Sequence, residues 1–485
     1  MRRAALMMSV AALAVASCAT PVADPTISQS EFQRANEQHE DIVAEFGGAV
    51  GGSQAAYVEQ VGDRVAVYSG TPNAAAAYKF TTLNSAVENA FAIPGGRIYI
   101  TRQLMGLMND EAELAFVLGH EVGHIAADHA QLRQATAQRN SILGVLGAIV
   151  GGVVGGDVGG LIARGSQYGT QLRTLSYSRD QEYESDTLGV GYMTQAGYDP
   201  DAGADMLAVL DRSTKLQSRL QGRENRTTPE WARTHPLSEN RVARAAQLAD
   251  QVPNAPQNRN RDAFLAQIDG MYFDDDPAQG IIDGRTFTHP DLRLRFQVPT
   301  GFQMQNSTRQ VGISGSSGQA IFSLAQYNGN LDQYVVQVMR GVAGQQANIQ
   351  VPQPRRTTVN GIPAAYSTAR VNTQNGAVDL SVFAYEFSND RAYHFATITR
   401  AGQGLQPFSS MIGSLQRLSA QQAAAVRPRV IDIYTVRSGD TIQSLARRMA
   451  YDNYQVERFA SLNGLATNQQ LRAGQKVKLI VYGRR

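Results

Sequence analysis

The strongest constraint in the sequence is the segment from His120 to His124, which reads His-Glu-Val-Gly-His. It lies in a run with apolar residues at helical spacing, and Asn109 or Asp110 offers an N-cap for that helix. Two histidines four residues apart on a helix differ by about 40° in direction, so both imidazoles can reach one metal ion. Glu121 points to the neighbouring flank, where it can contact a water at that metal. A buried helix with hydrogen-bonded histidines is the alternative interpretation.

Gly119 lies directly before this motif, and Gly123 lies within it. Glycine costs a helix about 1 kcal/mol relative to alanine. Two glycines here therefore indicate that something approaches the helix backbone closely.

A metal site needs a third protein ligand. His129 lies about 180° around the helix from His120, so we expect it to face away as a structural or surface residue. Glu182 and Asp186 are four residues apart and share a helix face, whereas Glu184 points about 200° away from Glu182. We therefore predict Glu182 as the third ligand and Asp186 as the acceptor for the distal nitrogen of His120. A solvated acidic helix is the alternative.

Five motifs occur in one order: Asn89–Ile100, His120–His124, Glu182–Asp186, Ala196–Pro200 and Thr234–Pro236. Together they make the region from Ser28 to Val252 resemble metallopeptidase family M48. The resemblance implies a mostly α-helical, zincin-type domain over residues 31–252, with a small edge-strand sheet. It also implies that His120, His124 and Glu182 bind one Zn²⁺ in a gluzincin-like metalloendopeptidase, with Glu121 as the general base.

The expected chemistry is peptide hydrolysis. Zinc held by three protein ligands keeps one position for water and lowers the pKa of that water from about 15.7 toward 7. Glu121 would accept the proton and return it to the leaving amine. His235, with Arg241 behind it, is the candidate for stabilising the oxyanion. His235 could instead take the fourth zinc position in a resting state, or merely cap a helix before Pro236.

A strand is expected beside the metal. Asn89, Ala90, Phe91 and Ala92 precede a Pro-Gly-Gly turn and the alternating segment Arg97–Thr101. An edge strand there could pair with an extended substrate through main-chain hydrogen bonds. An ordinary structural hairpin fits the pattern equally well.

The N-terminus reads as a targeting segment. Arg2 and Arg3 precede the apolar run Ala4–Ala16, which predicts a signal peptide over residues 1–17. The sequence before Cys18, the single cysteine, resembles a bacterial lipobox. We expect lipidation of Cys18, a tether over residues 18–30 and a periplasmic protein anchored to the outer membrane. Simple secretion is the alternative.

The remaining charge is balanced. The chain has 44 basic and 42 acidic side chains, and removal of Arg2 and Arg3 leaves 42 of each. This balance gives no reason to expect nucleic-acid binding.

The segment Ile142–Ala163 is apolar and long enough to span a bilayer, with Asp157 as its only charge. It holds eight glycines, and a single crossing would separate His124 from Glu182. We therefore predict a glycine-rich lid or plug near the cleft, which could also enforce latency.

A length of 485 residues fits about three domains. A polar linker is expected over 253–283. Alternating segments such as Leu292–Val298 then predict a small α+β domain over 284–418, whose function is unknown. A second linker is expected over 419–430.

Residues 431–485 resemble a LysM module, a short βααβ unit that binds N-acetylglucosamine polymers such as peptidoglycan. The resemblance rests on Tyr434–Ile442, Asn463–Leu465 and Gly474–Leu479. By this resemblance, two loops line the sugar groove, with the residues Gly439, Asp440, Thr441, Asn463, Gly464 and Leu465.

These features predict a lipid-anchored zinc endopeptidase of the periplasm that acts in protein quality control on misfolded or stalled envelope proteins. One alternative is a hydrolase of peptidoglycan peptides, although D-residues would fit an edge-strand cleft poorly. Another is a non-catalytic chaperone or scaffold at the cell wall. The sequence leaves the natural substrate and the oligomeric state open.

Overall fold

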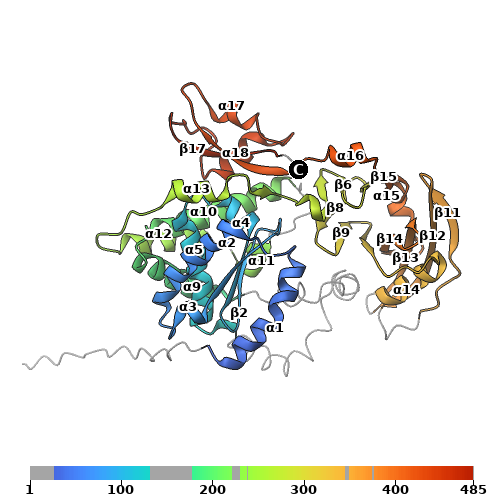
Figure 1. Cartoon of the computed structure of the whole chain (residues 1–485), viewed down its shortest axis with the longest axis horizontal. Coiled ribbons are helices and arrows are strands. Elements are labelled where there is room, and N and C mark those ends of the chain that lie inside the picture. The colour runs from blue at the N-terminus through green and yellow to red at the C-terminus, as the bar shows by residue number, and fades with distance from the viewer. Residues whose placement is uncertain are drawn as a thin grey trace, which may run out of the picture.

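The computed structural model describes residues 27–130, 177–220, 230–236, 239–343, 349–373 and 376–483. The expected signal peptide, Cys18 and the segment Ile142–Ala163 lie outside these residues. Figure 1 shows a helical N-terminal domain, a sheet-rich domain and a small domain that lies against the first. Among the described helices, none has the length and apolar character needed to cross a bilayer.

The N-terminal domain combines helices with one three-stranded sheet. Its helices are α1 (Gln29–Glu45), α2 (Gly52–Ala66), η1 (Val67–Ser69), α3 (Ala74–Ala77), α4 (Arg102–Leu107), α5 (Glu111–Ala126), α9 (Arg179–Gln195), α10 (Asp201–Leu220), α11 (Glu230–Thr234), α12 (Glu239–Asp250) and α13 (Arg261–Ile268). Strands β1 (Lys79–Leu83), β2 (Ala90–Ile93) and β3 (Arg97–Thr101) form a sheet in the order β1-β3-β2. Strand β1 runs parallel to β3, and β2 runs antiparallel to β3. In the part of the chain that the structure describes, β2 pairs with β3 alone and is therefore at the edge of the sheet.

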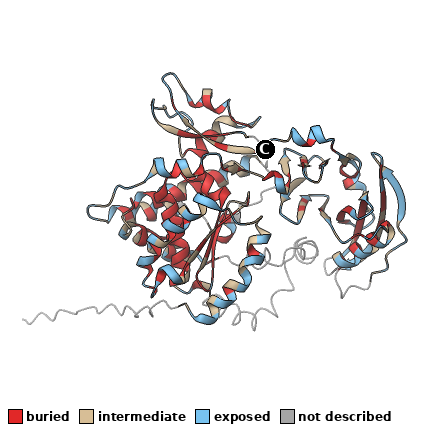
Figure 2. Ribbon diagram, in the orientation of Figure 1, coloured by how far each residue is buried: buried red, intermediate tan, exposed pale blue. Residues whose placement is uncertain are grey.

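The two faces of this sheet are covered by different helices. Ala92 and Ile98 belong to the large core that includes α2 and α5. Phe91 and Tyr99 face the other way and pack with Ile42 of α1. This alternation is the two-residue period of a strand, here buried on both sides. Figure 2 shows buried residues concentrated in the helices of this domain.

Helix α5, which carries the His-Glu-Val-Gly-His motif, begins where the sequence predicts. The side chain of Asp110 caps it by accepting from the backbone N–H of Glu113. Helix α9 begins with a capping box between Ser178 and Gln181. Both helix starts are thus fixed by local hydrogen bonds.

Glycines let α5 and α9 pack unusually close together. A Cβ atom on Gly189 would lie 2.9 Å from the backbone nitrogen of His120, and one on Gly119 would lie 3.2 Å from the carbonyl oxygen of Gly189. A methyl group at Gly189 would push the helices apart. The glycines of the motif therefore allow α9 to pack closely against α5. This packing brings Glu182 to the histidines.

The sheet-rich domain is α+β, as expected. Its elements are β5 (Ile281–Asp283), β6 (Thr286–His289), β7 (Leu294–Gln297), β8 (Gln303–Asn306), β9 (Gln310–Gly315), β10 (Gly318–Leu324), α14 (Leu331–Ala343), β11 (Arg355–Val359), β12 (Ile362–Thr373), β13 (Gly376–Ser388), β14 (Arg391–Arg400), η3 (Gln406–Phe408), α15 (Ser409–Ser414) and β15 (Gln416–Arg417). A seven-stranded antiparallel sheet, β11-β12-β13-β14-β10-β9-β8, packs α14 on one face and the sheet β15-β7-β6-β5 on the other.

The C-terminal domain has the expected β-α-α-β order: β16 (Arg429–Thr435), α17 (Ile442–Ala446), α18 (Gln455–Leu462) and β17 (Lys476–Tyr482). Besides β17, strand β16 pairs with β4 (Tyr272–Phe273), which comes from the segment before the sheet-rich domain. Ile431 and Leu479 belong to the same hydrophobic core as α5. The small domain is therefore packed onto the N-terminal domain.

The two segments expected to be linkers are partly structured. Residues 253–283 contain α13, β4 and η2 (Pro277–Gln279), and Phe264, Leu265 and Ile268 are buried. Residues 419–430 contain α16 (Ala420–Ala424) and the start of β16. The sequence analysis did not predict these helices because they are short. Each holds too few apolar residues to show a helical period.

Lys478 joins the small domain to the N-terminal domain. Its side chain is buried, and Nζ donates to the carbonyl oxygens of Gly106, Leu107 and Met108 at 2.9, 2.9 and 2.5 Å. These carbonyls end helix α4, where the helix dipole favours a cation. Burial lowers the pKa of Lys478 to about 7, opposed by the nearby carboxylate of Glu113.

We expect Lys478→Met to lower the free energy of unfolding by roughly 3 kcal/mol, because buried carbonyls lose their donors. Lys476→Met on the same strand is the matched control, since its contact with Asp262 at 3.2 Å is largely exposed and is expected to contribute less than about 1 kcal/mol. Urea unfolding of the full chain measures both. Equal losses in the two variants would contradict the role of Lys478.

Candidate metal centre

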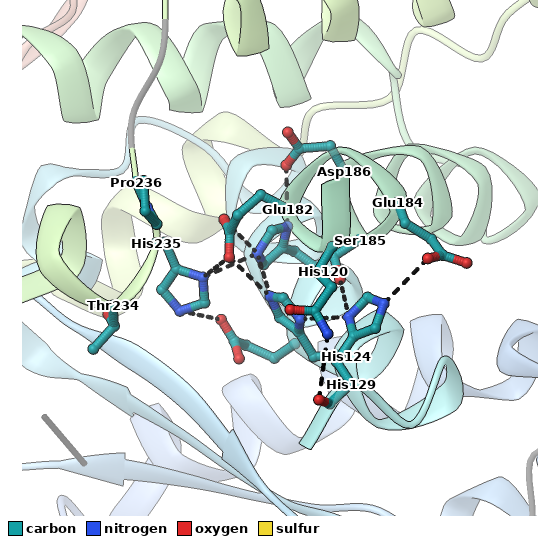
Figure 3. A network of polar contacts seen from close by, with 12 residues as sticks. His120, His124, His129, Glu182, Glu184, Ser185, Asp186, Thr234, His235 and Pro236 are labelled. Atoms are coloured by element: carbon teal, nitrogen blue, oxygen red, sulfur yellow. Dashed lines mark hydrogen bonds and ion pairs between the residues drawn. The ribbon is translucent and has the colours of Figure 1, made fainter. Parts of the chain in front are cut away.

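Four buried side chains converge from three places in the chain (Figure 3). His120 and His124 lie on α5, Glu182 lies on α9, and His235 follows α11. One ligand atom from each lies within 4.8 Å of the others. The three predicted ligands are thus together, and His235 is placed as a fourth.

The distances fit a tetrahedral metal site. Nε2 of His120 lies 3.0 Å from Nε2 of His124 and 3.3 Å from Nδ1 of His235. Oε1 of Glu182 lies 3.4 Å from Nε2 of His124 and 3.0 Å from Nδ1 of His235. A tetrahedron with metal–ligand bonds of about 2.0–2.1 Å has ligand atoms about 3.3–3.4 Å apart. Three imidazole nitrogens and one carboxylate oxygen at these separations suit a divalent cation such as zinc.

A buried arginine fixes the carboxylates of α9. Nη1 of Arg241 lies 2.7 Å from Oε2 of Glu182, and Nε and Nη2 bond both oxygens of Asp186 at 2.8 and 2.7 Å. Oδ1 of Asp186 in turn lies 3.0 Å from Nδ1 of His120, the nitrogen that faces away from the other ligands. Arg241 therefore contacts the carboxylates from outside the ligand set. Its part with His235 in stabilising an oxyanion stays a prediction.

The charges around Glu182 favour its ionised form. Burial acts to raise the pKa of this carboxyl group, but the positive charges of His235 and Arg241 hold the pKa well below its usual range. A carboxylate that stays ionised when buried is the state that a metal ligand requires.

Glu121 lies beside the cluster. Its carboxylate is fully buried, and Oε1 lies 3.5 Å from Nε2 of His235. Neither oxygen makes a well-formed hydrogen bond to a described residue. Burial raises the pKa of Glu121, against the charges of His235 and His120 and the backbone amide of Ala92. A buried carboxyl group with a raised pKa is suited to accept and return a proton.

Two aromatic rings pack against the ligand histidines. Trp231 stacks on His235 with ring centroids 4.3 Å apart, and Tyr177 stacks on His124 at 3.8 Å. Sequence reasoning found neither residue. The one available signal was that Trp231 is the single tryptophan of the chain. His120, His124, Glu182 and His235 are each at most 2% exposed, so a substrate cannot reach them in this conformation.

The start of the edge strand β2 lies next to residues 230–236, the segment that carries Trp231 and His235. The expected substrate strand is β2 with the residue before it: Asn89, then Ala90, Phe91 and Ala92. The hydroxyl of Thr234 lies 3.5 Å from Oδ1 of Asn89. The backbone N–H of Trp231 donates to the carbonyl of Glu88 at 3.1 Å. Residues 230–236 are therefore bound to the beginning of the strand that we expect to receive a substrate.

His129 is not where the sequence analysis placed it. It is buried, and its Nδ1 lies 2.9 Å from Nδ1 of His124. Helix α5 ends at Ala126, and Asp128 has a left-handed φ of 54°, so the chain turns back. Helical spacing does not extend past the last turn of the helix, and the expected direction of His129 was wrong for that reason.

The expected sugar-groove residues divide into two groups. Gly439 and Thr441 are exposed in the loop before α17, where the carboxylate of Asp440 accepts from the backbone N–H of Arg437 at 2.7 Å. Asn463 is buried and holds β17, accepting from the backbone N–H of Lys478 at 2.7 Å. This bond contradicts a groove position for its side chain.

The neighbours of Asn463 face the N-terminal domain. A Cβ atom on Gly464 would lie 3.4 Å from Nδ2 of Asn109 and from Nη2 of Arg212, and Leu465 is half-buried against the large core. The second expected loop is thus turned toward the N-terminal domain.

Removal of the third ligand tests the metal centre. We expect Glu182→Ala to lose the bound divalent metal, because the ligand set loses its one anionic member and Nη1 of Arg241 loses its carboxylate partner, which leaves uncompensated positive charge beside the three imidazoles. Asp180→Ala, at an exposed position in the first turn of the same helix, is the control and should keep the metal. Elemental analysis of the full-length proteins measures both. Full metal content in the Glu182 variant would contradict the assignment.

Comparison with known proteins agrees with this geometry. Residues 52–249 match Peptidase family M48, and residues 434–479 match the LysM domain. A solved structure from Bacteroides thetaiotaomicron aligns over 42% of this chain and 88% of its own at 9% identity, with a TM-score of 0.24, too low to support an argument.

Curated relatives match over part of their length. A beta-barrel assembly-enhancing protease of Escherichia coli O157:H7 is 28% identical over 221 residues, which are 44% of this chain and 43% of that protein. A mitochondrial metalloendopeptidase OMA1 of Schizosaccharomyces pombe is 25% identical over 232 residues, which are 47% of this chain and 63% of that protein. This chain thus spans less than two thirds of either relative. With the buried cluster of histidines and glutamate, these matches identify a metallopeptidase domain of family M48, followed by a LysM domain.

Proposed function

We propose that this protein is a zinc-dependent endopeptidase of the bacterial cell envelope that cleaves misfolded or stalled envelope proteins. The observation that carries the proposal is the buried carboxylate of Glu121 beside the ligand atoms of His120, His124 and Glu182. A peptidase needs both parts, a metal site and a base next to it.

The residues of the chain have distinct parts in the reaction. Zinc, when bound, would polarise the substrate carbonyl and lower the pKa of water. Glu121 would accept the proton of the attacking water and pass it to the leaving amine. The edge strand β2 would hold an extended substrate through main-chain hydrogen bonds, which favours unfolded segments over folded domains.

His235 must move before a substrate can bind. Its Nδ1 takes the fourth corner of the ligand set, 3.3 Å from Nε2 of His120 and 3.0 Å from Oε1 of Glu182. This position supports the resting-state interpretation over the oxyanion role for the conformation described. We propose that displacement of residues 230–236 frees both the fourth corner and the start of β2.

Location and partners are part of the proposal. The LysM domain supports binding to peptidoglycan, and a lipid on Cys18 would hold the protein at the outer membrane from the periplasmic side. The name of the Escherichia coli relative refers to assembly of beta-barrel proteins. We propose that proteins of this kind, when stalled or misfolded, are among the substrates.

Glu121→Gln tests catalysis. We expect the variant to keep its zinc and to cleave denatured casein at least about 100-fold more slowly, because the side chain can no longer accept a proton. Glu59→Gln, at an exposed position on α2, is the control and should match the wild type. Wild-type cleavage rates in the Glu121 variant would contradict its role as the general base. A variant that keeps its metal, loses cleavage and leaves the cellular phenotype unchanged would favour a chaperone or scaffold role instead.

The same assay separates the substrate classes. Purified sacculi are offered alongside denatured casein, and released peptides are measured by mass spectrometry. We expect cleavage of casein alone. Release of peptidoglycan peptides that depends on Glu121 would support the wall-hydrolase alternative.

His235→Ala tests the resting state. We expect the variant to keep zinc through its three other ligands and to bind a small hydroxamate at least about tenfold more tightly, because the inhibitor no longer competes with an imidazole. Trp231→Phe keeps a ring against His235 and is the control. Titration of the inhibitor at equal metal content measures this change. Equal affinity in the wild type and the His235 variant would contradict occupation of the fourth corner.

A further inference from the structure

The ligand histidine His124 also contacts a residue outside the ligand set. Its Nε2 faces the other ligands, 3.0 Å from Nε2 of His120, whereas its Nδ1 lies 2.9 Å from Nδ1 of His129 (Figure 3). Both residues are at most 2% exposed. Their contact is therefore a buried one, made between two imidazoles without solvent.

The direction of this hydrogen bond follows from the ligand role of His124. An imidazole that binds a cation through Nε2 carries its proton on Nδ1 and must donate it to an acceptor. The acceptor present is Nδ1 of His129, so that nitrogen must hold a lone pair. The proton of neutral His129 then lies on Nε2.

The surroundings of His129 are consistent with that tautomer. Its Nε2 lies 3.2 Å from Oε2 of Glu184, a carboxylate that can only accept when ionised. The hydroxyl of Ser185 lies 3.4 Å from Nδ1 of His129, and because that nitrogen has one lone pair, this longer contact is the weaker branch of a three-centre hydrogen bond shared with His124. The side-chain amide of Gln181 donates to the carbonyl of His129 at 3.4 Å, which holds its backbone. One assignment of protons satisfies all of these contacts.

The other ligand histidine is supported differently. Nδ1 of His120 lies 3.0 Å from Asp186, whose side chain is 3% exposed and bonded to Arg241. Nδ1 of His124 is supported by a neutral imidazole, which is supported in turn by Glu184 with 57% of its side chain exposed. His120 is therefore supported by a buried ion pair. His124 is supported by one imidazole ring, whose own partner Glu184 is exposed at the protein surface.

We propose that His129 is a positioning residue for the metal site, which sets the tautomer and ring orientation of His124, and that Glu184 sets the tautomer of His129. The inference rests on metal binding at His120, His124, Glu182 and His235 but not on the identity of the substrate. It extends the metal site by a chain of contacts from Glu184 through His129 to His124.

Two substitutions of His129 separate hydrogen bonding from packing. Asn places Oδ1 close to the former Nδ1, so His129→Asn keeps an acceptor for His124. Gln places its polar end near the former Nε2, so His129→Gln removes that acceptor while filling more of the space. Affinity for Zn²⁺ is measured on the full chain by competition with a chromogenic chelator, and the visible spectrum of the Co²⁺ form reports ligand geometry.

We expect His129→Gln to bind zinc about 10–100-fold more weakly than the wild type, with an altered Co²⁺ spectrum, as is typical when a ligand loses its supporting partner. His129→Asn should stay within about threefold of the wild type and keep the spectrum, because the acceptor that supports His124 is preserved. Thermal unfolding of the metal-free proteins should be similar for the two variants. Equal affinities for Asn and Gln, whether both reduced or both unchanged, would overturn the proposal.

Substitutions at exposed Glu184 keep the proposal testable if the His129 variants fail to fold. Glu184→Gln retains an acceptor for Nε2 of His129 and should bind zinc like the wild type. Glu184→Ala lacks it and should bind several-fold more weakly. Equal zinc binding by both variants would contradict the proposal that Glu184 sets the tautomer of His129. A wild type that binds no zinc would instead contradict the metal centre and the proposed function.

Discussion

The close contact between α5 and α9 is the constraint on which the rest of the site depends. A Cβ atom at Gly189 would lie 2.9 Å from the backbone nitrogen of His120, so this pair of helices can approach only with glycine there. The approach brings Glu182 to the two histidines and Asp186 to the far side of His120. A shift of one methyl radius at this contact would move the carboxylate out of reach of the imidazoles, because ligand atoms must lie within a few tenths of an ångström of their positions.

The conformation described is closed around this site. His235 lies at the fourth corner, Trp231 stacks on it, and the same segment bonds to Glu88 and Asn89 at the start of β2. One short segment therefore contacts both the ligand atoms and the two residues that precede the edge strand. The LysM domain is also packed in place by Lys478 and a shared core, so the N-terminal and C-terminal domains form one continuous structure.

The sequence predicted the ligand-bearing helices well because local signals define them. The motif spacing, the Asp110 cap and the Glu182–Asp186 pair each depend on helical geometry alone. The position of His129 could not be predicted, since it depends on a left-handed turn at Asp128 that ends the helical register. Trp231 stacks on His235 four residues later in the chain. Tyr177 stacks on His124 of α5, and no local pattern encodes such a long-range contact. The docking of the LysM domain was missed for the same reason, because β4 and Lys478 find their partners far away in sequence.

The central claim is that three imidazoles and one carboxylate hold a single divalent ion in the resting protein. X-ray absorption at the zinc edge on the full-length chain measures that coordination directly. The account predicts one zinc per chain with three nitrogen ligands and one oxygen ligand at about 2.0–2.1 Å. A first shell with only two imidazoles, or a protein purified under zinc-replete conditions without bound metal, would contradict it.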